Sequence, residues 1–274
     1  MRASTSPSTD LRRIALGAGL LAGTANVIMQ LGHPAVGHGV VESKVDSGNV
    51  FKHPVKRLRT TLAYLAVATM GTDEERGLYR RAVNRSHVQV RSDADSPVSY
   101  NAFDPDLQLW VAACLYRGFE DVYRLLGMRL DPGDAAEIYR RSAVLGTTLQ
   151  VPAESWPADR EAFERYWDDA LGKIHIDDTV RGYLTDLTAM RNLPRPVQLA
   201  LGRFNRFVTT GFLPPRFREE MRFDWDPSRQ RGFERLMSAI GVLVRLSPPV
   251  LRAFPFNAVL WDLRRRVSTG RPLV

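Results

Sequence analysis

The sequence has a single cysteine, Cys114, in 274 residues. One thiol excludes an internal disulfide bond and any zinc or iron–sulfur site that needs several cysteines, and its apolar surroundings predict a small buried residue. The HExxH pattern of zinc peptidases and the GxSxG turn of α/β-hydrolases are also missing. His33 and His38 stand five residues apart across Pro34, which is not the helical spacing of a metal-binding pair.

Lysine is rare, so the formal net charge of +8 comes almost wholly from arginine. A positive balance favours an acidic partner such as nucleic acid, anionic lipid or an anionic cofactor. The arginines are scattered along amphipathic segments and are not collected in one arm, so we expect no nucleic-acid partner. The Arg264–Arg266 triplet is expected to be a solvated helix end, where cations are favoured by the helix dipole.

Long, strongly apolar runs are missing as well. The uncharged stretch of residues 14–32 contains Asn26, Gln30 and several glycines, which make it too polar for a membrane span. It also has no A-x-A cleavage site of a signal peptide. We therefore expect a buried helix over residues 14–32 with close packing at its glycines. The protein is expected to be cytoplasmic, with peripheral membrane association left open.

Helical spacing of apolar residues runs through the chain, and no sustained two-residue alternation indicates a strand. Pro54 and Gly71 bound one predicted helix, and a capping box from Thr72 to Glu75 begins the next. Further helices are predicted over about 105–127, 132–148, 158–172, 177–190, 195–209, 227–246 and 249–267. Without a repeat or a long linker, residues 11–274 are predicted to form a single all-α domain after a disordered tail, residues 1–10.

One predicted helix carries an isolated histidine on an apolar stripe. Tyr79, Val83 and His87 fall on one face, and arginines stand close to the histidine in the sequence. A lone imidazole on an apolar wall is how helical proteins hold haem iron from one side. A hydrogen-bonded core or boundary histidine produces the same local pattern, so the residues alone leave both interpretations open.

Several pieces of the chain, spread over about residues 11–245, resemble one protein family. In order they are MQLGHPAVGHGVVES, RLRTT, VNRSHVQVR, YNAFDP with a following Leu and Trp, VPAESWPADREAFERYWDD and LPPRFREEMRFDWDP. With these pieces the chain resembles the family that groups uncharacterised bacterial proteins with the rubber oxygenase (latex clearing protein) catalytic domain and the fungal mpaB oxygenase. The resemblance implies a globin-like helical domain that holds haem b and uses dioxygen.

The resemblance also implies roles for residues of the histidine segment. His87 corresponds to the proximal iron ligand of the latex clearing proteins, and Arg91 corresponds to the arginine four residues after it. The family's arginine three residues before the histidine is Asn84 here, with Arg85 adjacent. The resemblance therefore implies cofactor binding by His87, Arg91 and Arg85.

On the distal side, the family's Arg-x-x-Lys-Thr element corresponds to residues 57–61. Arg57 and Thr61 are retained, whereas Thr60 replaces the lysine that can cap the iron. Glu42 precedes Arg57 by about the interval of the family's catalytic glutamate. The resemblance implies that Glu42 is a general base, able to take a proton if burial raises its pKa. A structural ion pair between Glu42 and Arg57 is the alternative.

The missing lysine and the short chain outside the core argue against polyisoprene as the substrate. We expect a haem-dependent oxygenase that acts on another hydrophobic small molecule or lipid with dioxygen. A haem-binding carrier or sensor without turnover shares His87 but needs no base at Glu42. A third alternative is an all-α interaction protein that binds no cofactor.

Overall fold

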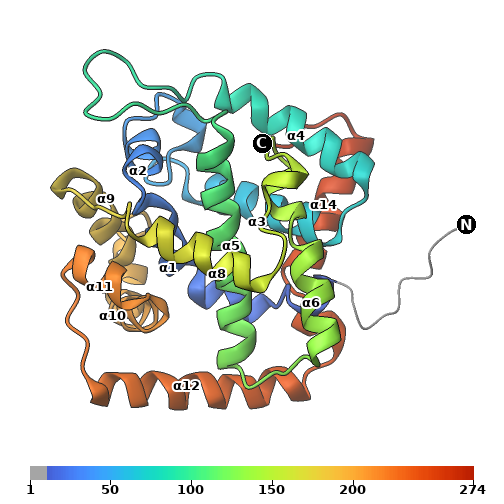
Figure 1. The fold of residues 1–274 in the computed structure, drawn as a ribbon, viewed down its shortest axis with the longest axis vertical. Coiled ribbons are helices and arrows are strands. Elements are labelled where there is room, and N and C mark those ends of the chain that lie inside the picture. Colours follow the sequence, from blue (N-terminus) through green and yellow to red (C-terminus); the bar gives the residue numbers. More distant parts are fainter. Residues whose placement is uncertain (1–10) are drawn as a thin grey trace, which may run out of the picture.

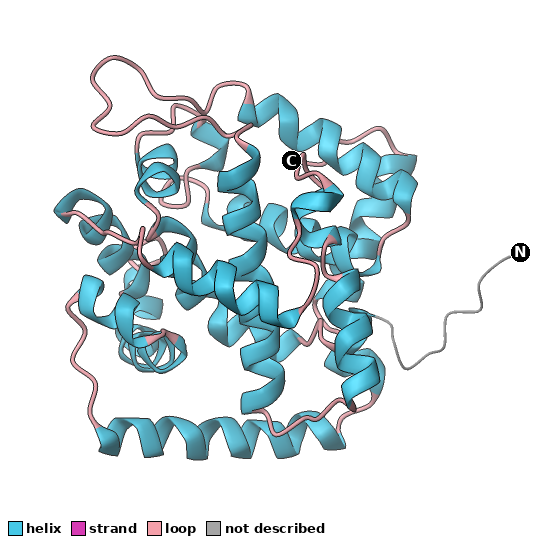
Figure 2. Ribbon diagram, viewed as in Figure 1, coloured by secondary structure: helices cyan, strands magenta, loops and turns pink. Residues whose placement is uncertain are grey.

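A computed structural model describes residues 11–274 of the chain. Every regular element in this range is a helix, apart from one isolated bridge between Arg91 and Asn101. The all-α prediction is confirmed, as Figure 2 shows. The predicted disordered tail, residues 1–10, lies outside the described residues.

The elements follow the chain in a simple order that Figure 1 traces by colour. Short 3-10 helices separate some of the α-helices near the N-terminus and before α8. The elements are η2 (Leu11–Arg13), η3 (Gly17–Ala22), α1 (Gly23–Leu31), α2 (Pro34–Val41), η4 (Asp46–Gly48), α3 (Pro54–Met70), α4 (Asp73–His87), α5 (Pro105–Leu125), α6 (Pro132–Arg141), α7 (Val144–Thr147), η5 (Ala153–Ser155), α8 (Arg160–Leu171), α9 (Asp178–Thr188), α10 (Arg195–Phe212), α11 (Pro215–Met221), α12 (Pro227–Leu246), α13 (Pro249–Arg252) and α14 (Phe256–Ser268).

The long helix α5 passes through the middle of the fold (Figure 1). Asp104 caps its first turn by accepting from two backbone N–H groups, and Pro105 occupies the first helical position. Trp110 is buried and stacks on Trp167 of α8 with ring centroids 5.3 Å apart. Cys114 is fully buried in the same helix, so the prediction of a small buried residue is confirmed.

The N-terminal segment differs from its prediction in helix type. Residues 14–32 are buried in part as expected, but only Gly23–Leu31 is α-helical, and Gly17–Ala22 is a 3-10 helix. Close packing holds at Gly17, where an added Cβ would lie 1.7 Å from the carbonyl oxygen of Phe254. At Gly19 an added Cβ would meet nothing within 4 Å, so this glycine is not required for packing.

Two predicted helices are interrupted. The helix expected over 132–148 ends at Arg141 and resumes at Val144. The helix expected over 249–267 is divided into α13 and α14 around Pro255, which has no N–H to continue the hydrogen-bond ladder.

Two short helices, α2 and α11, were not predicted. Tertiary contact explains α2. Gly37 lies so close to α1 that an added Cβ would be 2.6 Å from the Leu31 carbonyl oxygen, and Gly39 lies against the ring of Tyr100. Helix propensity disfavours these glycines, so packing against neighbouring elements decides the local structure.

The C-terminal helix α14 packs along α3. Arg264 pairs with Glu75 at 2.6 Å and Arg266 with Asp262 at 2.7 Å, so the expected solvated arginine triplet is in part engaged in ion pairs. Within residues 11–274, no helix combines the length and the apolar character that crossing a bilayer requires.

Candidate functional site

His87 is the last residue of α4, and its side chain is half-buried. The Nδ1 atom is buried without a hydrogen-bond partner, and the ring meets Phe103 edge to face at 6.2 Å between centroids. Burial, helped by the positive charge of Arg57, lowers the pKa of His87 to about 4. The neutral form of the imidazole is therefore favoured, and in this form one ring nitrogen carries a lone pair, as a metal ligand must.

His33 has a similar local environment. Its Nδ1 is also buried without a hydrogen-bond partner, and burial together with the charge of Lys173 lowers its pKa. His33 is the N-cap residue of α2, whereas His87 lies close enough to Arg57 for that charge to lower its pKa. Within residues 11–274, no group of three or more His, Cys, Asp or Glu side chains could hold a metal ion.

The predicted distal residues lie on α3, which packs beside α4. Thr60 and Thr61 both donate their hydroxyls to the Arg57 carbonyl oxygen, at 2.9 and 3.0 Å. Arg57 is exposed, and its Nη1 donates to the Thr61 hydroxyl at 3.4 Å. The Tyr79 hydroxyl of α4 donates to the Thr60 carbonyl oxygen at 2.6 Å. This bond ties the two helices that carry Arg57 and His87.

The residues that flank His87 divide into two groups. Arg85 and Arg91 are exposed, and Arg85 makes only a long bond, 3.4 Å, to the Arg81 carbonyl among the described residues. Because Arg85 is two positions from His87 on one helix, the two side chains lie on opposite faces of α4. Asn84 accepts a hydrogen bond from Gln150, so its amide belongs to the core of the fold.

Glu42 directly follows α2 and is held by three side chains. Its Oε1 lies 2.6 Å from Nδ1 of His38, and its Oε2 accepts from the hydroxyls of Ser96 at 2.7 Å and Tyr100 at 3.0 Å. Partial burial favours the neutral acid, but these three hydrogen bonds outweigh it and lower the pKa of Glu42. The net shift of the Glu42 pKa is downward, so the condition that burial raises this pKa is not met.

The alternative ion pair between Glu42 and Arg57 is also wrong. In the described part of the chain, Glu42 pairs with His38 and not with Arg57. In the sequence His38 stands out only as a possible metal ligand, so this bond was not predicted. The four-residue spacing from His38 to Glu42 could have indicated it, because such residues are neighbours on a helical surface.

His38 is buried and bonds a second carboxylate through its other ring nitrogen. Its Nε2 lies 2.6 Å from Oδ2 of Asp177, the residue that caps α9 through a bond from the Val180 N–H. Burial disfavours the charged imidazole, but the hydrogen bonds to Asp177 and Glu42 prevail and raise the pKa of His38. A protonated imidazole can donate to both carboxylates at once. No local pattern in the sequence links Asp177 to α2.

One loop, residues 88–104, connects the two parts of the site. Backbone bonds from Ala102 to Val90 and from Ser92 to Tyr100, both 2.9 Å, draw its two arms together. The loop supplies Ser96 and Tyr100 to Glu42, and Phe103 to His87. We call Glu42, His38 and Asp177 the acid–imidazole network, and the loop is its link to His87.

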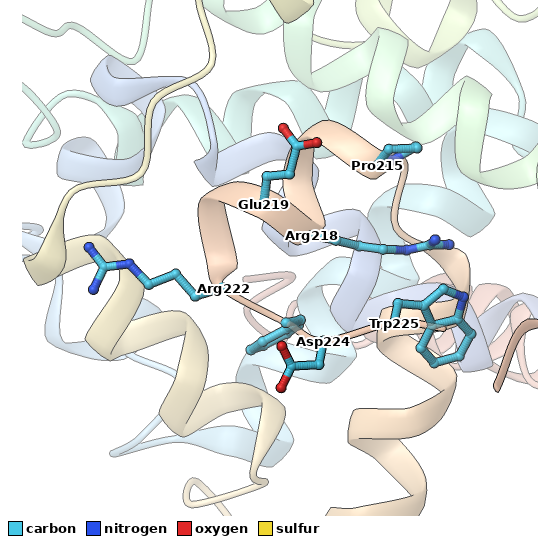
Figure 3. A pocket seen from close by; sticks show the side chains of 7 residues that line it. Pro215, Arg218, Glu219, Arg222, Asp224 and Trp225 are labelled. Carbon is cyan, nitrogen blue, oxygen red and sulfur yellow. The ribbon is translucent and has the colours of Figure 1, made fainter. Parts of the chain in front are cut away.

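A surface hollow lies elsewhere, beside α11, and Figure 3 shows its lining. Arg218 lies over the ring of Trp225 at 5.1 Å and donates to the carbonyl oxygens of Thr210 and Gly211. These contacts hold α11 against the end of α10, so the guanidinium has a structural role. None of the predicted site residues lines this hollow.

The fold and the site define an all-α protein with an unpaired, neutral imidazole and a nearby acid–imidazole network. The family model described as "ER-bound oxygenase mpaB/B'/Rubber oxygenase, catalytic domain" matches residues 11–242, and the chain belongs to this family. The resemblance inferred from the sequence is thereby confirmed.

Two mycobacterial proteins are similar over nearly the whole chain. They are the uncharacterized protein Mb2261 of Mycobacterium bovis and the uncharacterized protein Rv2237 of Mycobacterium tuberculosis. Each is 52% identical over 255 residues, which is 93% of this chain and 100% of the relative. No solved structure matches the chain, so the globin-like arrangement implied by the resemblance stays a prediction.

Proposed function

We propose that the chain is a haem b-dependent oxygenase that oxidises a hydrophobic small molecule or lipid with dioxygen. Membership of an oxygenase family supports the reaction class. The single observation that carries the cofactor assignment is the buried, unpartnered Nδ1 of a neutral His87. One imidazole supplies one ligand, so an iron ion held there needs its other ligands from a macrocycle, as in haem proteins.

Haem b would be held by His87, and bound haem would supply the activation of dioxygen. Phe103 fixes the orientation of the imidazole through its edge-to-face contact. Arg91 is exposed beside the bridge to Asn101 and is available for a carboxylate of the cofactor. Arg85 is a weaker candidate, because it lies on the opposite face of α4 from His87.

Residues of the chain would supply a positive charge and a proton acceptor near the substrate. Arg57 places a positive charge near His87, and the Thr61 hydroxyl lies within reach of that guanidinium. Thr60 brings no amine to this side, so the family's lysine cap has no counterpart. Glu42, ionised and held by Ser96, Tyr100 and His38, could accept a substrate proton at Oε2 after displacing one hydroxyl donor.

Purified protein reconstituted with hemin tests the cofactor assignment. We expect a Soret band for the wild type and loss of most bound haem for His87→Ala, with helical circular dichroism retained. His33→Ala is the matched control, because His33 also has a buried, unpartnered Nδ1 but no assigned role. A wild type that stays colourless, or equal loss of haem in both variants, would refute ligation by His87.

A non-catalytic haem carrier or sensor is the second candidate, and one observation favours it. Both carboxylate oxygens of Glu42 already have hydrogen-bond partners, which suits a scaffold as well as a base. Oxygen uptake with a reductant and a panel of lipids separates the two candidates. For a catalytic base, Glu42→Gln lowers turnover by about 10²–10⁴-fold while the Soret spectrum is unchanged.

Arg57→Met serves as the companion variant in this experiment. Because Arg57 does not pair with Glu42, its loss should leave the melting temperature nearly unchanged. Unchanged oxygen uptake in Glu42→Gln, together with a lower melting temperature, would reject the catalytic role and leave Glu42 as part of the scaffold.

A further inference from the structure

The end of α12 and the following α13 expose a dense group of large apolar side chains. Leu243, Leu246, Val250, Leu251 and Phe254 are 66%, 79%, 69%, 63% and 59% exposed, and we call these five residues the C-terminal apolar face. All five lie within twelve consecutive residues, 243–254. Single exposed apolar side chains need no explanation, but several within one short segment indicate an interaction surface.

Two arginines of this segment hydrogen-bond the backbone around the face. Arg252 donates to the carbonyl oxygens of Ser247 and Arg245, which folds α13 back on the end of α12. Arg245 donates to the Leu126 carbonyl oxygen and thereby ties α12 to the end of α5. The backbone that carries the apolar side chains is therefore held in place by these hydrogen bonds.

The segment that carries the C-terminal apolar face has charges of one sign. From Arg235 to Trp261 the sequence has three arginines and no acidic residue. Arg245 and Arg252 bond backbone carbonyl oxygens, and in the described part of the chain neither is paired with a carboxylate. A hydrogen bond to a carbonyl oxygen leaves the guanidinium charge uncancelled.

The element η3 extends this surface. Gly17 touches the backbone of Phe254, and η3 packs against α13. Leu20 is three residues further along the 3-10 helix, so it projects from the same side as Gly17, and it is 44% exposed. Residues 14–41 likewise contain no acidic residue. The face therefore continues onto a second segment without acidic residues.

We propose that the C-terminal apolar face docks on an anionic lipid bilayer. The exposed leucine, valine and phenylalanine side chains would enter the headgroup region of the bilayer, and the arginines would contact lipid phosphates. Peripheral proteins bind anionic membranes through this combination. Charge complementarity selects this occupant over a second copy of the chain, because two copies would bring together surfaces of the same sign. All five residues of this face lie beyond residue 242, where the family match ends.

Vesicle sedimentation of the full-length protein tests the docking. We expect binding to vesicles of phosphatidylcholine that contain phosphatidylglycerol, and binding weaker by roughly tenfold or more to pure phosphatidylcholine or at high salt. The double variant Leu246→Ser/Leu251→Ser should lose at least about tenfold in affinity for the anionic vesicles.

Val88→Ser is the matched control, because Val88 is 61% exposed and follows α4, near the opposite end of the fold from α12 (Figure 1). This variant should bind the vesicles as the wild type does. Both changes are at exposed positions, so circular dichroism should confirm an unchanged fold.

Two outcomes would overturn the proposal. One is equal binding of the wild type and the double variant to anionic vesicles. The other is no vesicle binding, together with a dimer in analytical ultracentrifugation that the double variant abolishes. The second result would assign the face to a further copy of the chain. Neither readout depends on haem or turnover, so the proposed oxygenase activity is tested separately.

Discussion

Acid should destabilise the cofactor-free protein through His87 specifically. The pKa of this residue falls from its ordinary 6.5 to about 4 in the folded chain. Between these values the unfolded chain binds a proton that the folded chain does not. Stability therefore rises with pH through this window and is lost as pH falls below the ordinary pKa.

The size of the effect follows from the shift. By linkage, lowering the pH from about 7.5 to about 5 should lower the free energy of unfolding by about 2 kcal/mol through His87 alone. The full shift corresponds to about 3 kcal/mol at still lower pH. His87→Leu keeps an apolar side chain beside Phe103 and removes the titration.

Urea denaturation at the two pH values measures this contribution. Every other titrating group is common to both proteins. The decrease in the free energy of unfolding on acidification should therefore be smaller by about 2 kcal/mol in His87→Leu than in the wild type. Val88→Leu, at an exposed side chain that carries no titrating group, is the control and should show the pH dependence of the wild type. An identical pH dependence in wild type and His87→Leu would refute the buried, neutral imidazole and with it the basis for ligation.

Two further predictions concern the acid–imidazole network and the N-terminal packing. The pKa of His38 is raised, so its stabilising contribution is full below its ordinary value of 6.5 and is lost as pH rises through the raised value. The difference in unfolding free energy between wild type and His38→Gln should therefore narrow from mildly acidic to alkaline pH in urea titrations, and a constant difference would contradict the bonded imidazolium. Gly17→Ala should cost about 1–3 kcal/mol of stability, since the added methyl group collides with the Phe254 backbone. Thermal melts should place Gly19→Ala, where nothing lies within 4 Å, close to the wild type.

The sequence was sufficient for the helices with local signals. The capping box at Thr72 and Glu75 forms as predicted, and so does the start of α5 at Pro105. These features depend on side chains that bond the backbone a few residues away, so pattern alone finds them. The short helix α2 depends on the contact of Gly39 with Tyr100, which lies far along the chain, and no local rule predicts it.

In the candidate site, too, some features follow from the local sequence and others from contacts between distant residues. The family pattern brought attention to His87 and Glu42, and the structure gives each a distinct environment. The sign of the Glu42 pKa shift could not be predicted, because it is set by Ser96 and Tyr100, which are more than fifty residues away in sequence. Asp177 is further still, and only the packing of α9 on α2 brings it to His38.

The pKa values of His87 and His38 are shifted in opposite directions, because the two side chains have different neighbours. His87 is buried beside a positive charge and without a partner at Nδ1, so its neutral form is favoured. His38 is buried between two carboxylates, so its charged form is favoured and holds Glu42 ionised. Groups whose environments separate their protonation states in this way are suited to divide a reaction between them. The loop of residues 88–104 contacts both His87, through Phe103, and Glu42, through Ser96 and Tyr100, so it is the segment that connects the two groups.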